Sequence, residues 1–433
     1  MAPLSPRDHA VDVLDAASRE QCFVDTALDA HAVAAGLSHA QRPLVTEIVY
    51  GVTRRRLTLD WLIRHYSRRP LEKLDPALRL ILQVGLYQLL FLDTVPEYAA
   101  VSEAVEAAKR KLHAGAGAFA NGLLRTVLRA KEALPWPAID VDAAEHIAVV
   151  HSHPRWLVRR WIKESGRKQT AEICRINNLP PAITLRANRL KVTRDELIEH
   201  LRGEGAEARP APGDETAVRI RSPKPLNTLE AFARGEFYVQ DTTAMRVARL
   251  LGPRPGTRLL DLCAAPGGKT GHCAELMDDT GCIIACDLDE RRLDVLRANM
   301  TRLGLTCVEP TRCDARHVPG LLPRGSFDRV LLDAPCSNTG VLRRRAEARW
   351  RLREDNIESL SVRQAALLDA AAHMPTPRGV LVYSTCSIEP EENGRAVRAF
   401  LSRHGEFKLD AEELVLPTAD ADGGYMARLT RAS

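Results

Sequence analysis

The chain has 433 residues, 45% of them hydrophobic, and a formal net charge of +5. This length favours two or three domains, and no apolar run is long enough to span a membrane. Ten cysteines are too few for a disulfide-dense secreted protein, and no Cys-x-x-Cys pair suggests a zinc site. We therefore expect a cytoplasmic protein with free thiols, no bound metal and no membrane partner.

Positive charge is concentrated in the middle of the chain. Residues 146–235 contain 17 Lys and Arg against 10 Asp and Glu, whereas the parts before and after are nearly balanced. This distribution favours a polyanionic partner, although arginines exposed to water explain it equally well.

Residues 1–140 are predicted to be helical throughout. Apolar residues recur there at spacings of three and four, and Asp75 with the following proline has the pattern of a capped helix start. Helices over Ala99–Leu112 and Phe119–Leu134 would be separated by a loop at Gly115–Gly117. We predict an all-α bundle of six or seven helices.

Residues 141–236 mix helix and strand patterns. A basic helix at Arg155–Cys174 precedes a strand at Ala182–Arg186, a helix at Arg194–Arg202 and a second strand at Ala217–Arg221. A small α+β module is expected.

From residue 237 to residue 433, strands and helices alternate, which indicates a doubly wound, Rossmann-like α/β domain with a mainly parallel sheet. In such a sheet the ligand binds beyond the carboxyl ends of the strands. The predicted strands are Arg258–Leu262, Cys282–Asp287, Cys307–Arg312, Arg329–Asp333 and Val380–Ser384, and the predicted helices include Glu290–Leu303, Glu354–His373 and Glu391–His404.

The first of these strands leads into a glycine-rich turn within Asp261–Thr270. Gly268-Lys269-Thr270 resembles the end of a P-loop, but Cys263 stands where that motif needs its first glycine. The other interpretation is a site for an adenosyl or dinucleotide cofactor. Asp287 supports it, because this acid ends the next strand twenty residues after Gly267 and could bind ribose hydroxyls.

Further polar residues follow the later strands. Asp314 and Asp333 match hydroxyl and amine donors better than a triphosphate. Cys336 and Cys386 lie on polar turns after the fourth and fifth strands, where a thiolate could act as a nucleophile. The pattern alone leaves both catalysis and simple packing open for these two cysteines.

Three motifs in order resemble those of the RNA 5-methylcytosine methyltransferases of the RsmB (Sun/NOP2) family. They are Asp261–Thr270, Asp333-Ala-Pro-Cys-Ser337, and Tyr383-Ser-Thr-Cys-Ser387 with Pro390-Glu-Glu-Asn393. The resemblance covers the whole chain. It implies a NusB-like RNA-binding domain at 1–140, a basic linker or RNA-binding module at 141–236 and a Rossmann-like methyltransferase domain at 237–433.

The resemblance also implies a reaction, namely methylation of carbon-5 of one cytosine in 16S ribosomal RNA, free or in an assembling small subunit, by a monomer. Cys386 would be the nucleophile that adds to carbon-6 of the base, Cys336 would assist release, and Asp333 would contact the cytosine or the reactive methyl group. The cofactor would be S-adenosyl-L-methionine. Its expected binding residues are Cys263, Ala264, Ala265, Pro266, Gly267, Gly268, Lys269, Asp287 at the ribose, Asp314 at the adenine, and Asp333.

The chain departs from the family pattern at two places. Arg345 and Ala346 replace a common His-Pro, and Gly424 stands where an aromatic residue is usual, which we expect to affect RNA positioning or local packing. Six arginines between residues 343 and 353 are expected to contact phosphates. Three alternatives stay open: a non-enzymatic RNA-binding or antitermination factor, a P-loop ATPase, and a methyltransferase for another RNA.

Overall fold

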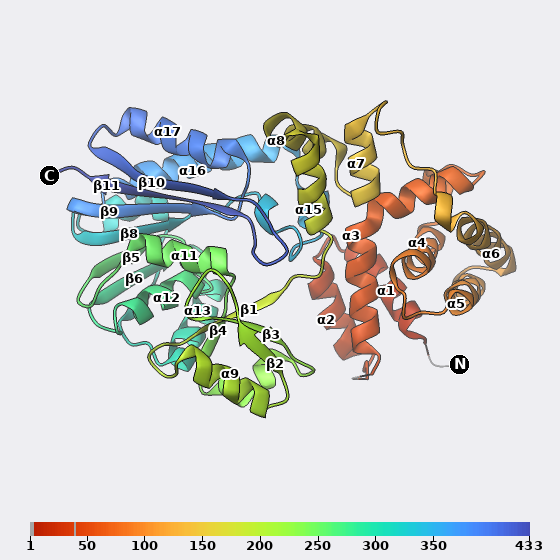
Figure 1. Cartoon of the computed structure of the whole chain (residues 1–433), viewed down its shortest axis with the longest axis horizontal. Helices are drawn as coiled ribbons and strands as arrows, with labels where there is room; N and C mark the ends of the chain where they lie inside the picture. The colour runs from red at the N-terminus through yellow and green to blue at the C-terminus, as the bar shows by residue number, and fades with distance from the viewer. Residues whose placement is uncertain (1–3, 39) are drawn as a thin grey trace. The chain divides into compact units, whose positions relative to one another are not determined.

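The computed structural model describes residues 4–38 and 40–433, which form two compact units (Figure 1). Unit 1 comprises Met1–Asn178 and Arg345–Arg351, and unit 2 comprises Leu179–Arg344 and Leu352–Ser433. The predicted domains 1–140, 141–236 and 237–433 group the residues differently and stay a prediction. Among the described residues, the structure has no helix with the length and apolarity that a membrane span requires.

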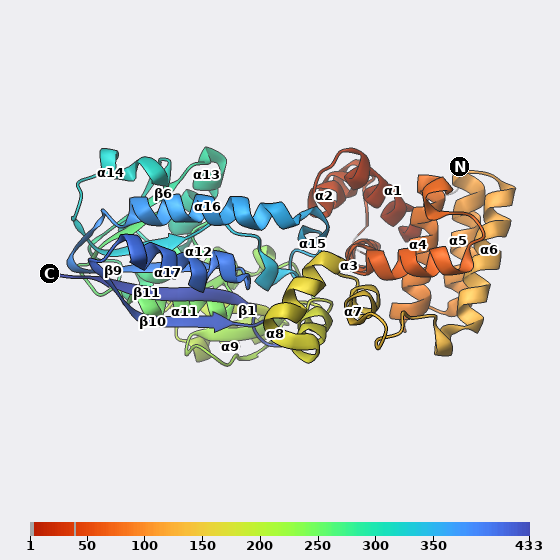
Figure 2. The ribbon, with the colours of Figure 1, turned by 90° about the horizontal axis from the view of Figure 1, so that it is seen from above.

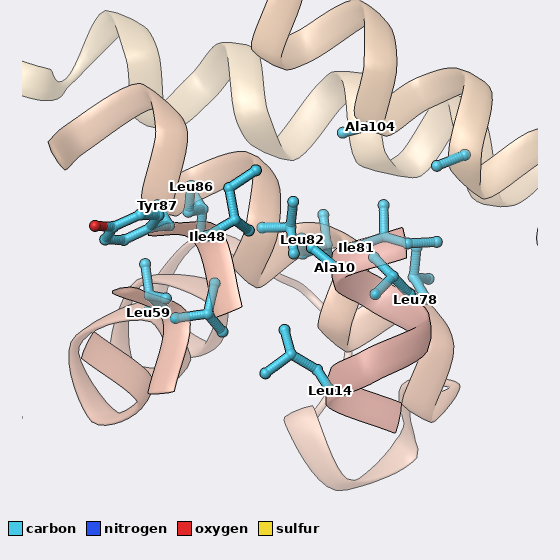
Figure 3. Packing of buried hydrophobic residues seen from close by; sticks show 14 of the residues in the cluster. Ala10, Leu14, Ile48, Leu59, Leu78, Ile81, Leu82, Leu86, Tyr87 and Ala104 are labelled. Carbon is cyan, nitrogen blue, oxygen red and sulfur yellow. The ribbon is translucent and has the colours of Figure 1, made fainter. Parts of the chain in front are cut away.

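Unit 1 is built from helices that pack around an apolar core. Side chains from α1, α3, α4 and α5 meet there, among them Leu14, Ile48, Leu82 and Ala104 (Figure 3). The helices are α1 (Pro6–Arg19), α2 (Val24–Ala34), α3 (Arg42–Tyr66), α4 (Pro76–Phe91), α5 (Glu97–Lys111), α6 (Ala114–Arg129), α7 (Ala143–His151) and α8 (Arg155–Ile176).

Glycine allows close contacts between these helices. A Cβ atom at Gly51 would lie only 1.9 Å from the ring of Tyr87, so α3 and α4 need glycine at this crossing. The loop predicted at Gly115–Gly117 is wrong, because these residues lie inside α6. A Cβ at Gly117 would be 2.6 Å from Cγ of Lys109, so this glycine serves helix packing rather than a turn.

A short segment from far along the chain completes unit 1. Its helix α15 (Ala348–Arg351) carries Arg349, which is fully buried. The guanidinium donates to the carbonyls of Ser152 at 3.1 Å and Asn177 at 3.0 Å, the C-cap residues of α7 and α8. Helix C-termini carry partial negative charge that stabilises a cation. Burial nevertheless lowers the pKa of Arg349 to about 9, and the predicted phosphate contact is wrong for this residue.

Unit 2 contains a four-stranded antiparallel sheet in the order β2-β3-β1-β4, with α9 (Arg194–Gly203) packed against it. Two of its strands were not predicted: β2, and β4 directly after residue 236. Both are short, and β4 pairs with β1. The strands are β1 (Ile183–Ala187), β2 (Glu207–Pro210), β3 (Ala217–Arg221) and β4 (Phe237–Val239), and the short helix α10 (Glu230–Ala233) precedes β4.

The larger sheet of unit 2 has the order β10-β11-β9-β8-β5-β6-β7. Strands β5 to β9 run parallel, whereas β11 is antiparallel to both β9 and β10. The predicted Rossmann-like class is therefore confirmed, and the chain reverses its direction across the sheet between β5 and β8. The strands are β5 (Arg258–Asp261), β6 (Cys282–Asp287), β7 (Val308–Arg312), β8 (Phe327–Asp333), β9 (Pro375–Thr385), β10 (Phe407–Val415) and β11 (Gly424–Arg431).

Helices cover both faces of this sheet (Figures 1 and 2). Because side chains alternate along a strand, Leu259 packs with α11, α12 and α13, while its neighbour Leu260 packs with α16 and α17. This double burial explains the continuous apolar runs in the sequence. The helices are α11 (Thr242–Leu251), α12 (Gly268–Leu276), α13 (Glu290–Leu303), α14 (Val318–Leu321), α16 (Glu354–Ala371) and α17 (Gly394–Arg403).

A buried ion pair joins the two sheets of unit 2. Arg186 on β1 and Glu275 on α12 are 0% and 1% exposed, and their side chains form two hydrogen bonds of 2.7 and 2.9 Å. The same guanidinium donates to the carbonyl of Gly268 at 2.8 Å. Arg186 therefore holds the small sheet against the start of α12.

Candidate active site

A cleft of about 290 Å³ lies at the carboxyl ends of β5 and β8, where the order of the sheet reverses. Most of the predicted cofactor turn lines it, together with Lys269 and Asp333, whereas Gly267, Asp287, Asp314, Cys336 and Cys386 are not part of the lining. The lining residues are Thr184, Tyr238, Val239, Gln240, Asp241, Ala244, Asp261, Cys263, Ala264, Ala265, Pro266, Gly268, Lys269, Asp333, Arg344 and Asp422.

The two glycines of the turn allow close approach of neighbouring elements. Gly267 has a φ of 102°, in the region that favours glycine, and a Cβ there would lie 2.9 Å from Cε of Met300. A Cβ at Gly268 would be 3.0 Å from the ring of Tyr238. The backbone of the turn therefore fits between α13 and β4 only because both positions lack side chains.

Asp261 ends β5 with a buried carboxyl group that the sequence analysis did not assign to the site. Its Oδ2 accepts from Thr270 Oγ1 at 2.7 Å, and its Oδ1 has no hydrogen-bond partner among the described residues. Burial raises the pKa of Asp261 to about 7, although the hydrogen bond from Thr270 opposes this. An unused acceptor beside the cleft fits a ligand with an ammonium or hydroxyl donor.

Two other acids lie at strand ends near the turn, and each has a partner within the protein. Asp287 accepts from the backbone N–H of Ala265 at 3.2 Å and so ties the end of β6 to the turn. The Arg316 guanidinium, whose Nε lies 3.0 Å from Oδ1 of Asp314, lowers the pKa of that carboxyl to about 2. Their predicted contacts with ribose and adenine stay predictions.

Lys269 caps a carboxylate on the neighbouring strand. Its Nζ lies 2.6 Å from Oδ2 of Asp333, and Ser384 Oγ donates to Oδ1 of Asp333 at 2.7 Å. Burial lowers the pKa of Lys269, but the charge of Asp333, its hydrogen bond to Lys269 and the other neighbouring negative charges together outweigh burial, and the pKa is raised. The end of β8 is thus linked to the turn after β5 and to β9.

The structure brings the two predicted cysteines into contact. Their Sγ atoms are 3.1 Å apart, and Cys386 Sγ donates to Asn338 Oδ1 at 3.1 Å. The hydrogen bond with Cys386, together with burial, raises the pKa of Cys336 well above its usual value. Both thiols are half-buried on loops that follow adjacent strands, β8 and β9.

Asn338 orients this pair and was missed by sequence reasoning. Its backbone has a φ of 62°, a left-handed conformation that asparagine tolerates better than most residues. Its Nδ2 donates to the carbonyl of Cys336 at 2.9 Å, which turns Oδ1 toward Cys386. A lone asparagine after a Cys-Ser dipeptide offers no signal that would have predicted this contact.

Two of the three departures from the family pattern, Gly424 and Ala346, lie in packed surroundings. A Cβ at Gly424 would be 2.9 Å from the carbonyl of Thr385, directly before Cys386, so an aromatic residue would displace this loop. Ala346 is buried and Arg345 is exposed. Arg343 is fully buried and donates to Asp422 Oδ1 at 2.6 Å, so the predicted phosphate contact is wrong for Arg343 as well.

Comparisons with known proteins match this chain to one family over most of its length. The family descriptions "NusB family", "Methyltr_RsmF/B-like, ferredoxin-like domain" and "16S rRNA methyltransferase RsmB/F" match residues 4–129, 153–227 and 248–428. A "Probable ribosomal RNA small subunit methyltransferase B" of Bacillus subtilis is 36% identical over 411 residues, 95% of this chain and 91% of the relative. A protein of the same description from Synechocystis is 37% identical over 431 residues, 99% of this chain and 96% of the relative.

Solved structures show the same architecture. The crystal structure of PH0851 matches with a TM-score of 0.81 and 30% identity, and the match covers 98% of this chain and 99% of that one. NSun6 from Pyrococcus horikoshii, solved with SFG, an analogue of S-adenosylmethionine, matches with a TM-score of 0.60 and 24% identity over 66% of this chain and all of that one. The latter likeness concerns the fold alone.

Proposed function

The chain belongs to the ribosomal RNA small subunit methyltransferase B family, whose cofactor is S-adenosyl-L-methionine, and we propose that it methylates carbon-5 of one cytosine in 16S ribosomal RNA. Cys386 forms a covalent bond with the base in this proposal. The contact of 3.1 Å between the Sγ atoms of Cys386 and Cys336 is the main support, because it places two thiols at the ligand edge of the sheet. Packing alone does not require two half-buried thiols there.

The chemistry explains why a nucleophile is needed. Carbon-5 of cytosine is a poor nucleophile, so direct methylation is slow. Addition of the Cys386 thiolate to carbon-6 converts carbon-5 into an enamine-like nucleophile. After methylation, loss of the proton from carbon-5 restores the double bond, and the sulfur departs with the electrons of the carbon–sulfur bond.

Cys336 assists the second half of this reaction. Its raised pKa keeps a proton on the thiol beside Cys386, so it can hydrogen-bond to the sulfur as the carbon–sulfur bond breaks. Asp333, held by Lys269 and Ser384, has a fixed orientation at the same edge and is proposed to contact the cytosine.

The residues of the cleft fit the cofactor, which supplies the methyl group when bound. The turn Cys263–Lys269 would hold its methionine and ribose side, and the unused Oδ1 of Asp261 suits the methionine ammonium group. Asp287 and Asp314 are proposed at the ribose and adenine. A P-loop ATPase is disfavoured, because the cleft carries four aspartates against two cations, and Lys269, which a P-loop would use on phosphates, is already paired with Asp333.

The RNA target is proposed to be a cytosine that leaves its stack, since a paired base cannot reach a cleft at a strand edge. We propose that a monomer acts on 16S RNA, free or in an assembling subunit. Residues 1–140 and 141–236 would contribute RNA binding, as NusB-like and linker modules, and 237–433 the chemistry.

The test maps 5-methylcytosine by mass spectrometry in rRNA from a strain that lacks the gene, complemented by the wild type or by Cys386→Ala. We expect one cytosine of 16S RNA to lose its methyl group in the deletion strain and to regain it only with the wild type. Purified Cys386→Ala should bind S-adenosylmethionine as the wild type does. Appreciable methylation by Cys386→Ala would disprove the nucleophile assignment, and a missing mark on another RNA would disprove the substrate.

A further inference from the structure

Glu392 is a fully buried carboxyl group to which the proposed reaction assigns no role. It lies in the single turn Pro390–Glu392, between β9 and α17. Its Oε1 accepts from the backbone N–H of Ser337 and from Gln364 Nε2, both at 2.9 Å. Its Oε2 accepts from the hydroxyls of Ser337 and Ser387. Four donors therefore converge on one side chain.

Two of these partners have a special place in the sequence. Ser337 directly follows Cys336, and Ser387 directly follows Cys386. Their hydroxyl oxygens are 3.0 Å apart over the same carboxyl group. Glu392 is thus hydrogen-bonded to the residue after each cysteine, and the Sγ atoms of the two cysteines are 3.1 Å apart.

The surroundings fix Glu392 itself. The hydroxyl of Tyr383 donates to its backbone carbonyl at 2.6 Å, and the next residue, Asn393, donates from Nδ2 to the carbonyl of Ser387 at 2.9 Å. A buried carboxyl group is costly unless it is hydrogen-bonded, and its removal would leave four buried donors without their acceptor. The carboxyl group orients the residues bonded to it, because hydrogen bonds fix the orientation of their partners and apolar contacts do not.

We propose that Glu392 is a positioning residue that holds Cys336 against Cys386 by bonding to the residue after each. This inference rests on the proposed function, in which Cys386 adds to the base and Cys336 assists its release. Addition needs the Cys386 thiol alone, whereas release needs the contact between the two thiols. Loss of Glu392 therefore affects release more than addition, and the covalent RNA adduct accumulates.

The first test measures the positions of the thiols without RNA. Dibromobimane links two thiols that lie close together, and peptide mass spectrometry identifies the link between Cys336 and Cys386 in the full-length protein. We expect Glu392→Ala to form this link at least about tenfold more slowly than the wild type, because the change removes four hydrogen bonds and the loss of one to a charged group already produces about this factor. Glu392→Gln should restore the rate, since its amide oxygen can replace Oε1 and its amino group can donate to the two hydroxyls.

The second test separates addition from release. Each variant is incubated with S-adenosylmethionine and transcribed small-subunit rRNA, and the adduct is measured as a band that resists denaturant. We expect Glu392→Ala to accumulate adduct as Cys336→Ala does. The double variant should accumulate no more than Cys336→Ala alone, because both changes remove the same contact.

A matched control is available in the same turn. Glu391 pairs with the more exposed Arg395 at 2.8 Å, and Glu391→Ala should leave both the link and the adduct level as in the wild type. If Glu392→Ala does not fold, Ser337→Ala and Ser387→Ala each remove one hydroxyl bonded to the carboxyl group and carry the same test.

Equal linking rates in Glu392→Ala and the wild type would overturn the inference, as would additive adduct levels in the double variant. Absence of adduct in Cys336→Ala has a different meaning. It would refute the release role of Cys336 in the proposed function, and the linking rates would then decide alone whether Glu392 positions the thiols.

Discussion

The helical bundle of unit 1 and the ligand edge of the large sheet in unit 2 have opposite kinds of interior. The apolar core of the bundle buries aliphatic side chains such as Ile48, Leu59 and Leu82 (Figure 3). The ligand edge buries Asp261, Arg343 and Glu392 at 1%, 0% and 0% exposure, and each is hydrogen-bonded. Apolar packing depends on volume, whereas hydrogen bonds also fix direction. The geometry of the ligand edge therefore depends on hydrogen bonds more than that of the bundle's apolar core does, although the bundle also buries hydrogen-bonded acids such as Asp8 and Asp60.

The largest expected effect concerns the buried ion pair that holds the small sheet against α12, the helix that follows the cofactor turn. Glu275→Ala leaves Arg186 buried without its carboxylate, and we expect the free energy of unfolding of unit 2 to fall by about 3–5 kcal/mol. Hydrogen exchange of peptides from β1 and α12 measures this loss. The double variant Arg186→Met with Glu275→Leu replaces the ion pair by apolar side chains. If it is as stable as the wild type, the ion pair serves to orient the two elements rather than to stabilise them. A loss below about 1 kcal/mol would contradict the comparison.

The next effect tests the bundle. Leu82 is fully buried on α4, and Leu82→Ala should lower the free energy of unfolding of unit 1 by about 2–5 kcal/mol through loss of apolar contact and formation of a cavity. Leu82→Met preserves volume and should cost less than about 1.5 kcal/mol. Hydrogen exchange in α3 and α4 checks both values. If Leu82→Ala and Leu82→Met lost equal stability, the stability of the bundle would depend on the exact shape of its side chains and not only on their volume, which would remove the contrast with the ligand edge.

The smallest effect concerns one carboxyl group of the edge. Without cofactor, Asp261 has a raised pKa of about 7, so below that pH it must lose a proton before it can pair with the methionine ammonium. Affinity for S-adenosylmethionine should therefore fall by up to about tenfold per pH unit as the pH decreases below 7, and level off above it. Calorimetry from about pH 5.5 to about pH 7 measures this slope. Asp261→Asn should bind more weakly with a flat profile, and an unchanged slope in that variant would rule out Asp261 as its source.

The sequence predicted those parts of the fold whose signals are local. The continuous apolar runs at Arg258–Asp261 and Cys282–Asp287 are buried on both sides, and such runs are recognisable without any partner. The strand Phe407–Val415 was not predicted, because four of its nine side chains are charged and all but Phe407 are at least partly exposed at the edge of the sheet. The glycines at 115–117 indicated a loop, and only the packing of α5 on α6 shows why a helix contains them.

The candidate site, like the fold, was predictable where the signal lies in the local sequence and not where it depends on tertiary contacts. Strand ends and the family motifs indicated Cys336, Cys386 and Asp333, and the structure places all three at neighbouring strand ends. The motif Pro390-Glu-Glu-Asn393 was recognised, but its sequence does not show which of two adjacent glutamates is buried. Glu392 and Glu391 differ only in the direction of their side chains, which depends on the tertiary fold.

The buried Arg349 has a consequence for the order in which the protein is made. Its acceptors at the ends of α7 and α8 leave the ribosome long before it does, because Asn177 precedes Arg349 by 172 residues. Domains generally fold from the N-terminus during synthesis. The carbonyls of Ser152 and Asn177 therefore lack this partner until Arg349 has been translated, after strands β5 to β8. A truncation of the chain after residue 178 would therefore remove Arg345–Arg351 from unit 1 and leave the ends of α7 and α8 without Arg349.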